Sequence, residues 1–335
     1  MPRIRTTTEP RRRPPLTWRQ TIIGRIRDDK LVPILSGTVD CNLALGGHAD
    51  LVKAYAAYSH YPSPPKPLPE MAQFKGTIDE SVADPLALKE DYVRFVKSYF
   101  FEQAEKNGVE QSALDEVDAQ FDELALTQMC DQLGYPYYCE ERCHPFLLLS
   151  AFNLSVYVTT SHHEFLEMAL CRAGRSPRTE FCRWHTGIEH FPSIFDDGYS
   201  PSRQEPLVYH LHGIDRYPRS LVLTEDDYLA FLVACSQNAG KATDPVHHPV
   251  RRAVSGSSLL LLGYGLQEWD FRSLFWGLVV QRAGDLTGVV SIQLEPDNMQ
   301  RLYLQKYLDG YHFKISWGTV QEAVQGLAEE VLDDL

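Results

Sequence analysis

Short apolar runs recur along the chain and alternate with stretches in which apolar residues are spaced three or four positions apart. Such short runs, bounded by small or polar residues, are typical of strands that are buried on both faces of a sheet. The pattern predicts about six strands, at 31–35, 154–160, 207–211, 258–262, 289–294 and 312–316.

The stretches between the predicted strands have the spacing of amphipathic helices. They predict helices at 18–29, at 51–58, within 85–133, from 165, at 271–279 and at 320–331. Within 85–133 an aromatic stripe, which is typical of a buried helix face, consists of Tyr92, Phe95, Val96, Tyr99 and Phe100. Five prolines between Pro62 and Pro69 interrupt the helical pattern and predict a loop.

The alternation of strands and helices predicts a doubly wound, mainly parallel α/β sheet of the Rossmann-like kind. A helical stretch at 62–145 follows the first strand–helix unit, and we interpret it as an inserted helical subdomain. The expected division is a basic disordered arm at 1–17, the sheet domain in two parts at 18–61 and 146–335, and the insertion between them.

The charge balance limits the classes of partner. The chain has 32 Lys and Arg residues against 45 Asp and Glu residues, a formal net charge of −13, which repels nucleic acid at long range. The exception is the Arg-rich arm at 1–15, which either touches nucleic acid or a partner, or is a solvated tail. No apolar run has the roughly 18–20 residues of a membrane-spanning helix, and none follows the first arginines as in a secretory signal. We expect a cytoplasmic protein without membrane contact.

The seven cysteines show no spacing typical of disulfides. Cys139 and Cys143, beside His144, form a close pair, but a structural zinc site needs a second pair. We therefore expect reduced thiols and no metal site.

Small or titratable residues follow four of the predicted strands. Ligands of open parallel sheets bind at the carboxyl ends of the strands, so these positions are candidates for a binding site. The group after the first strand, at 36–40, either lets backbone N–H groups approach a phosphate or forms an ordinary turn. A His beside a Gly, as at 212–213, either takes part in proton transfer or is a buried structural His. The four groups are Ser36, Gly37, Thr38 and Asp40; Ser161, His162 and His163; His212, Gly213 and Asp215; and Gly263, Tyr264 and Gly265, with W-D-F-R at 269–272.

These blocks resemble those of sirtuin-like domains. T-T-S-H-H-E-F-L-E at 159–167 is similar to their T-T-N-Y-D-x-L-L-E block, and Y-H-L-H-G at 209–213 is similar to their catalytic L-H-G. L-G-Y-G at 262–265, with W-D-F-R after it, resembles the turn that holds the adenosine side of NAD. Together with L-V-L-T-E-D-D-Y at 221–228, the blocks are similar to the prokaryotic branch found in anti-phage effectors; the resemblance covers 31–60 and 154–335.

The resemblance implies that NAD+ is the substrate and that, as in this branch, it is cleaved to nicotinamide and ADP-ribose. His212 would accept a proton from a ribose hydroxyl or from water, and Ser161 would position that water or the ribose. Asp270 either contacts NAD+ or pairs with Arg272. The residues implied to bind NAD+ are Ser36, Gly37, Thr38, Asp40, Thr160, His163, Gly213, Gly263, Tyr264, Gly265 and Asp270.

The sequence also departs from the pattern of sirtuin-like domains. Ser161 stands where they have Asn, His163 where they have Asp, and Ser36-Gly37-Thr38 where they have Gly-Ala-Gly. Two functions therefore remain open. One is an NADase effector that is activated by homo-oligomerisation or by a separate sensor or ATPase, since the chain itself has no P-loop motif. The other is a catalytically weak or inactive subunit that binds NAD or ADP-ribose. A zinc-free deacylase is disfavoured by the missing cysteine pairs and the acidic composition.

Overall fold

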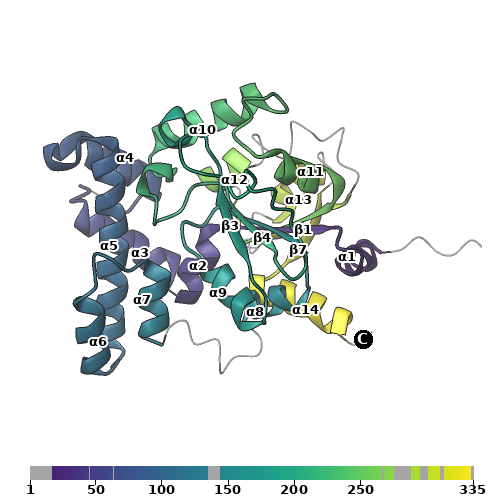
Figure 1. Ribbon diagram of the computed structural model, residues 1–335, viewed down its shortest axis with the longest axis horizontal. Helices are drawn as coiled ribbons and strands as arrows, with labels where there is room; N and C mark the ends of the chain where they lie inside the picture. Colours follow the sequence, from purple (N-terminus) through teal and green to yellow (C-terminus); the bar gives the residue numbers. More distant parts are fainter. Residues whose placement is uncertain are drawn as a thin grey trace, which may run out of the picture.

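The computed structural model describes residues 17–44, 46–62, 64–134, 144–265, 268–274, 288–294, 301–309 and 313–332. Its centre is a seven-stranded sheet in the order β3-β4-β2-β1-β5-β6-β7, in which every neighbouring pair is parallel (Figure 1). The Rossmann-like α/β fold that the alternation predicts is therefore confirmed. The strands are β1 (Leu31–Leu35), β2 (Val156–Thr159), β3 (Arg178–Phe181), β4 (Leu207–His210), β5 (Ser258–Leu262), β6 (Val290–Leu294) and β7 (Lys314–Trp317).

The predicted strands did not include β3, so the sheet has seven strands where about six were expected. This strand lies at the edge of the sheet and pairs with β4 alone. Its sequence, Arg-Thr-Glu-Phe, runs from an exposed Arg178 to a buried Phe181 and contains no apolar run. A hydrophobic pattern cannot reveal such a strand.

The sheet separates two hydrophobic cores, which explains why its central strands are buried along their whole length and are mainly apolar. Alternate side chains of β1 face opposite sides, with Leu31 and Leu35 in one core and Val32 and Ile34 in the other. The first core contains residues of α1 (Trp18–Arg27), α8 (Pro145–Ala151), α9 (Phe165–Arg172) and α14 (Val320–Leu332). The second contains residues of α10 (Glu225–Asn238), α11 (His248–Gly256), α12 (Trp269–Leu274) and α13 (Arg301–Asp309).

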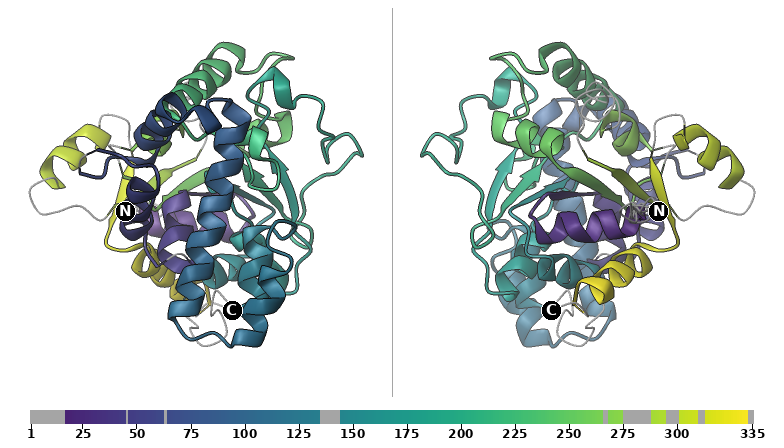
Figure 2. Two further views of the ribbon diagram at one scale, coloured as in Figure 1. Left: turned by 90° about the vertical axis from the view of Figure 1, so that its left-hand side faces the viewer. Right: turned by 90° about the vertical axis from the view of Figure 1, so that its right-hand side faces the viewer.

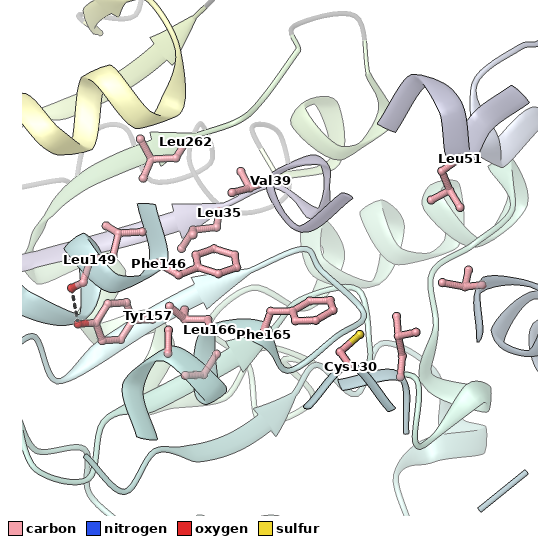
Figure 3. Close-up of a cluster of buried hydrophobic side chains, with 14 of the residues drawn as sticks. Leu35, Val39, Leu51, Cys130, Phe146, Leu149, Tyr157, Phe165, Leu166 and Leu262 are labelled. Atoms are coloured by element: carbon pink, nitrogen blue, oxygen red, sulfur yellow. Dashed lines mark hydrogen bonds between the residues drawn. The ribbon is translucent and has the colours of Figure 1, made fainter. Parts of the chain in front are cut away.

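Figure 3 shows the first core where the strands meet its helices. Leu35 and Leu262, from adjacent strands, lie beside Phe146 of α8 and Leu166 of α9. The Tyr157 hydroxyl donates to the Leu149 carbonyl over 3.1 Å, so this buried polar group is satisfied. The core fixes the strand ends relative to the helices that begin beside them.

A group of helices lies at one side of the sheet (Figure 1, left). It consists of α3 (His48–Tyr58), α4 (Leu68–Ile78), α5 (Pro85–Lys106), α6 (Gln111–Asp118) and α7 (Leu126–Gln132), and Figure 2 shows α5 running across it. The segment 85–133 thus forms three helices. The ring of Tyr55 packs edge-on against Tyr92 and Phe95, with centroids 5.6 and 5.0 Å away, so the aromatic stripe contributes to packing as predicted.

Some predictions fall outside the described residues. These are the basic arm up to residue 16, the pair Cys139 and Cys143, and the continuation of the helix predicted at 271–279 beyond Leu274. No helix within the described ranges is long and apolar enough to cross a membrane.

Candidate active site

A cavity of about 390 Å³ lies at the carboxyl ends of β1 and β2, beside α2 (Gly37–Ala44). The strand order reverses here, because from β1 the chain adds β2, β4 and β3 on one side and β5, β6 and β7 on the other. Open α/β sheets bind their ligands at such reversal points. The residues that line the cavity include Gly37, Thr38, His48, Tyr92, Thr160, Ser161, His162, His163, Tyr228, Glu268, Trp269 and the proline-rich segment 65–69.

The turn that follows β1, at residues 36–40 (the first turn), is hydrogen-bonded to the end of β5. The N–H of Ser36 donates to the Leu262 carbonyl over 2.9 Å, and the Thr38 hydroxyl donates to the Gly263 carbonyl over 2.6 Å. Gly263 has a φ of +78°, and a Cβ added there would lie 2.4 Å from Cγ2 of Val39. Only glycine therefore allows this close approach of the β5 end to α2.

The backbone N–H groups at the start of α2 have hydroxyl acceptors. The N–H of Gly37 donates to Oγ1 of Thr160 and the N–H of Thr38 donates to Oγ of Ser36, both over 3.2 Å. A pyrophosphate oxygen bound at this helix start would have to replace those hydroxyl groups. The sequence predicted the turn but not that its backbone N–H groups have hydroxyl acceptors within the protein.

Ser161 and Asp40 meet at the wall of the cavity. Ser161 lines the cavity, and its hydroxyl donates to Oδ2 of Asp40, which comes from the first turn of α2. Both residues are 3% exposed. Burial raises the pKa of Asp40 to about 7, although the hydrogen bond from Ser161 acts in the opposite direction.

His163 forms a buried pair with Asp215. Nδ1 of His163 lies 3.0 Å from Oδ2 of Asp215, and the two side chains are 8% and 2% exposed. Burial acts to raise the pKa of Asp215, but the hydrogen bond and charge of His163 outweigh it and lower the pKa below its ordinary value. The His that stands where sirtuin-like domains have Asp is thus paired with a carboxylate from the loop after β4.

His210 contacts the backbone of Ser161 through a buried hydrogen bond. Its ring is fully buried, with Nδ1 2.7 Å from the Ser161 carbonyl and Nε2 2.9 Å from Oε1 of Glu167. Burial alone would lower the pKa of His210, but the Glu167 carboxylate raises it to about 9. Sequence reasoning missed this residue, although the block Y-H-L-H contains two histidines.

His212 lies next to the cavity but does not line it. Its ring is fully buried, with Nε2 3.2 Å from the Ser273 hydroxyl. The rings of Tyr228 and Phe231 pack edge-on against it, each with its centroid 5.0 Å away. Tyr228 both lines the cavity and contacts His212, and it is 6% exposed.

The remaining predicted residues serve the turns around the site. Gly213 has a φ of +84°, and a Cβ there would lie 2.2 Å from the Ser220 carbonyl oxygen. Tyr264 is buried and packs against Phe271, and the N–H of Gly265 donates to the Glu268 carboxylate over 3.3 Å. The side chain of Asp270 lies outside the described residues.

Several cavity residues were not predicted. Glu268 supplies a carboxylate, the group that commonly binds ribose hydroxyls in nucleotide-binding folds. Tyr92 was interpreted as core; it is 5% exposed, lines the cavity and packs edge-on against His162. The signal for Glu268 was its place directly before the W-D-F-R block.

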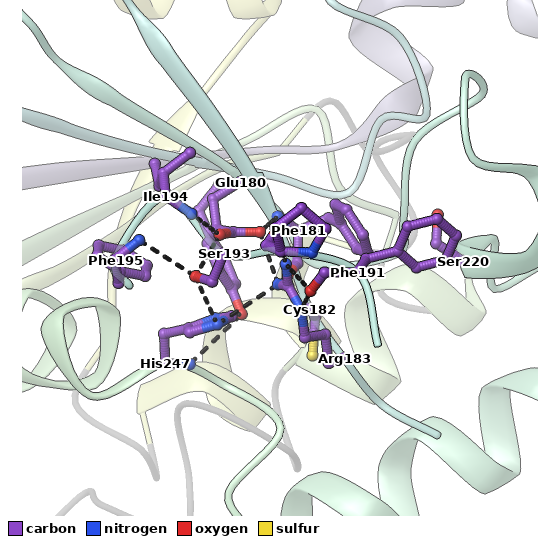
Figure 4. Close-up of polar contacts among 12 residues, drawn as sticks. Glu180, Phe181, Cys182, Arg183, Phe191, Ser193, Ile194, Phe195, Ser220 and His247 are labelled. Carbon is purple, nitrogen blue, oxygen red and sulfur yellow. Dashed lines mark hydrogen bonds and ion pairs between the residues drawn. The ribbon is translucent and has the colours of Figure 1, made fainter. Parts of the chain in front are cut away.

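A second buried polar cluster lies away from the cavity (Figure 4). The Glu180 carboxylate, on the edge strand β3, accepts from the Ser193 hydroxyl and from Arg183, each over 2.6 Å. His247 adjoins the same Ser193 hydroxyl, 3.3 Å from its Nε2. None of these four residues lines the cavity, and the hydrogen bonds of the cluster satisfy the buried Glu180 carboxylate at the sheet edge.

Within the described ranges, no group of three or more His, Cys, Asp or Glu side chains is arranged to hold a metal ion. Residues 155–315 match the family model of the SIR2-like domain, and such domains use NAD+. The matched segment contains Ser161, His163, His212 and Gly263, whereas the first turn at 36–40 precedes it. The comparison with curated proteins found no match.

Proposed function

We propose that this chain, which carries a SIR2-like domain at residues 155–315, is an NAD+ glycohydrolase that releases nicotinamide and ADP-ribose. One observation carries the proposal. A cavity with polar side chains lies at the reversal point of the sheet, and the SIR2-like segment supplies its Ser161, His163 and Glu268. That is where a dinucleotide binds in a sheet of this kind.

We propose one orientation for the substrate in the cavity. The pyrophosphate would bind at the first turn of α2, where it would replace the hydroxyl groups of Thr160 and Ser36 that accept from the backbone N–H groups of Gly37 and Thr38. Glu268 would accept hydrogen bonds from the adenosine ribose. The nicotinamide ribose would then lie beside Ser161 and His163, at the end of β2.

The chemistry is the cleavage of a bond between C1′ of the ribose and the nicotinamide nitrogen. Positive charge develops on the ribose as the neutral nicotinamide leaves, so carboxylates near the ring stabilise the transition state more than the ground state. Ser161 would position the attacking water. His212 would accept a proton from a ribose hydroxyl once the Tyr228 ring has turned aside, because this ring adjoins both His212 and the cavity.

We also propose that the enzyme acts in anti-phage defence and that oligomerisation or a partner activates it. A cell must restrain an enzyme that consumes its NAD+. The burial of His212 beside Tyr228 in a single chain supports such restraint.

The same observation favours a second candidate function. A chain whose His212 stays buried could bind NAD+ or ADP-ribose without cutting it, and would then serve as a sensor or an assembly subunit. Ser161 and His163, which replace the Asn and Asp of sirtuin-like domains, favour it as well.

The test is nicotinamide release from NAD+ by the purified chain at high concentration, with His212→Ala beside it. The matched control is His144→Ala, since His144 is 6% exposed and does not line the cavity. We expect release by the wild type and by His144→Ala, and none by His212→Ala. Release by all three would remove His212 from the mechanism. NAD+-dependent thermal stabilisation without release, also after candidate partners are added, would favour the binding function; neither binding nor release would contradict both proposals.

A further inference from the structure

We infer that Ser161 and Asp40 form a proton relay, in which the Ser161 hydroxyl takes a proton from a water in the cavity and passes its own to the buried Asp40 carboxylate. The inference rests on the proposed function and deepens it. Asp40 does not line the cavity, so it acts through Ser161 as a positioning residue and proton acceptor. Sequence reasoning had placed Asp40 among the residues that contact NAD+.

The hydrogen bonds of the Ser161 hydroxyl define the direction of the relay. A serine hydroxyl has one proton to donate and two lone pairs to accept with. The proton goes to Oδ2 of Asp40, and one lone pair accepts the N–H of His163 over 2.9 Å. A longer contact, 3.3 Å, joins the hydroxyl to the His163 carbonyl. The second lone pair remains for a water or a ribose hydroxyl in the cavity.

Charged groups on three sides tune the Asp40 carboxyl. His163, on the loop after β2, and His210, at the end of β4, lower the pKa of Asp40, whereas Glu167 of α9 raises it. Burial is larger than any of these effects, and the pKa of Asp40 becomes about 7. A group with such a pKa can take up a proton and release it again near neutral pH.

The neighbouring histidines are already engaged. Nδ1 of His163 is paired with Asp215, and both ring nitrogens of His210 lie at hydrogen-bond distance from an oxygen atom. Among the described side chains, Asp40 is the carboxylate that accepts the Ser161 proton.

The step balances without an additional reactant. The water oxygen bonds to C1′ while the bond from C1′ to the nicotinamide nitrogen breaks, and its electron pair leaves with nicotinamide. One water proton moves to Oγ of Ser161 as the Ser161 proton moves to Asp40. After ADP-ribose has left, the reverse path returns one proton to solvent.

The experiment compares steady-state kinetics of the full chain with those of Asp40→Asn, Ser161→Ala and the double variant from pH 5 to 9. Asn can still accept the Ser161 hydrogen bond but cannot take its proton. We expect each single variant to lower kcat about 100-fold with KM changed by less than about threefold. Asp40→Asn should also lose the acidic limb of the pH profile. The double variant should lose no more than either single one, because both residues serve one step.

Ser193→Ala is the matched control, since it removes another buried serine-to-carboxylate hydrogen bond, to Glu180, away from the cavity. It should leave kcat and the pH profile unchanged. Wild-type kcat and pH dependence in Asp40→Asn would overturn the relay while the proposed function stands. So would additive losses in the double variant, or weaker NAD+ binding and a lower Tm with an unaltered pH profile. A wild type that releases no nicotinamide, also at high concentration and after candidate partners are added, would overturn the proposed function and the relay with it.

Discussion

At the scale of single residues, the buried Asp40 carboxyl affects folding as well as chemistry. Its pKa is raised from 3.8 to about 7 in the folded chain. Between these values the folded state holds a proton that the unfolded state has released, so stability falls as pH rises through this window and the cost is complete above it. We expect Asp40→Asn to be more stable than the wild type above pH 7, by as much as about 4 kcal/mol, and the gain to shrink toward pH 4.

Urea unfolding of both proteins across that pH range measures the difference. Other titrating groups are common to the two chains and cancel in the comparison. A gain that does not change with pH would show that the Asp40 carboxyl titrates normally.

Alanine substitutions at two glycines distinguish the free-energy cost of a left-handed backbone from the cost of a steric clash. Gly213 and Gly174 have φ values of +84° and +76°, but a Cβ at Gly213 would lie 2.2 Å from a carbonyl oxygen, whereas nothing lies within 4 Å at Gly174. We expect Gly174→Ala to lower the free energy of unfolding by about 1 kcal/mol and Gly213→Ala by about 3 kcal/mol or more. Chemical denaturation of the two variants checks this, and equal losses would mean that the Ser220 loop moves freely.

At the scale of elements, the first turn of α10 holds three other elements in place. Glu225 accepts from the Trp269 indole of α12 over 3.2 Å, and Asp226 accepts from Gln73 of α4 over 3.0 Å. Asp227 accepts from Lys89 of α5 over 3.1 Å, and it also closes the capping box with Thr224 that starts the helix. The next residue is Tyr228, so these contacts position the ring that adjoins His212.

The Lys89–Asp227 ion pair is therefore expected to matter for both stability and binding. The two side chains are 6% and 15% exposed, whereas those of the pair Lys106–Glu102 are 64% and 63% exposed. Lys89→Met should cost about 2 kcal/mol or more, because it leaves the largely buried Asp227 carboxylate without its cation, and Lys106→Met less than about 0.5 kcal/mol. Calorimetry measures both costs. Lys89→Met should also weaken NAD+ binding; equal effects of the two variants would contradict this account of α10.

Local patterns predicted the central strands because each one contains a short apolar run and is buried along its length. The edge strand β3 escaped prediction because it contains no apolar run, and its buried Glu180 is stabilised by side-chain partners, Arg183 and Ser193, that a hydrophobic pattern does not reveal. The positions of the two histidines near the end of β4 could not be predicted either, because they depend on side chains from other elements. The His210 ring lies at hydrogen-bond distance from Glu167, and the His212 ring packs against the rings of Tyr228 and Phe231. Spacing places residues at a strand end, but packing decides which of them reaches the cavity.

At the scale of the whole molecule, the cavity is assembled from segments far apart in the chain. The sheet brings the first turn and the end of β2 together, which its topology allowed us to predict. The helical group adds Tyr92, and the loop after β5 adds Glu268. The positions of Tyr92 and Glu268 depend on how α5 and α10 pack against the rest of the molecule, and no local sequence pattern encodes that packing.

The same packing predicts that NAD+ cleavage is latent in the isolated chain. If the form with an accessible His212 is a minor one, the rate is reduced by its population, about 100-fold for a form populated at about 1%. Self-association that favours the open form would raise nicotinamide release per molecule as protein concentration increases. Tyr228→Ala should release nicotinamide at low concentration with little further increase, because the ring beside His212 is gone.

Chemical labelling tests the same idea without activity. Diethyl pyrocarbonate modifies accessible imidazoles, so His212, fully buried in the structure, should stay unlabelled in the wild type and become labelled in Tyr228→Ala. Tyr92→Ala is the control for cavity enlargement, since Tyr92 also lines the cavity and is similarly buried, but its ring packs against His162 and not His212. It should leave His212 unlabelled. Labelling of His212 in the dilute wild type would show that Tyr228 does not restrain access, and the latency would then need another cause.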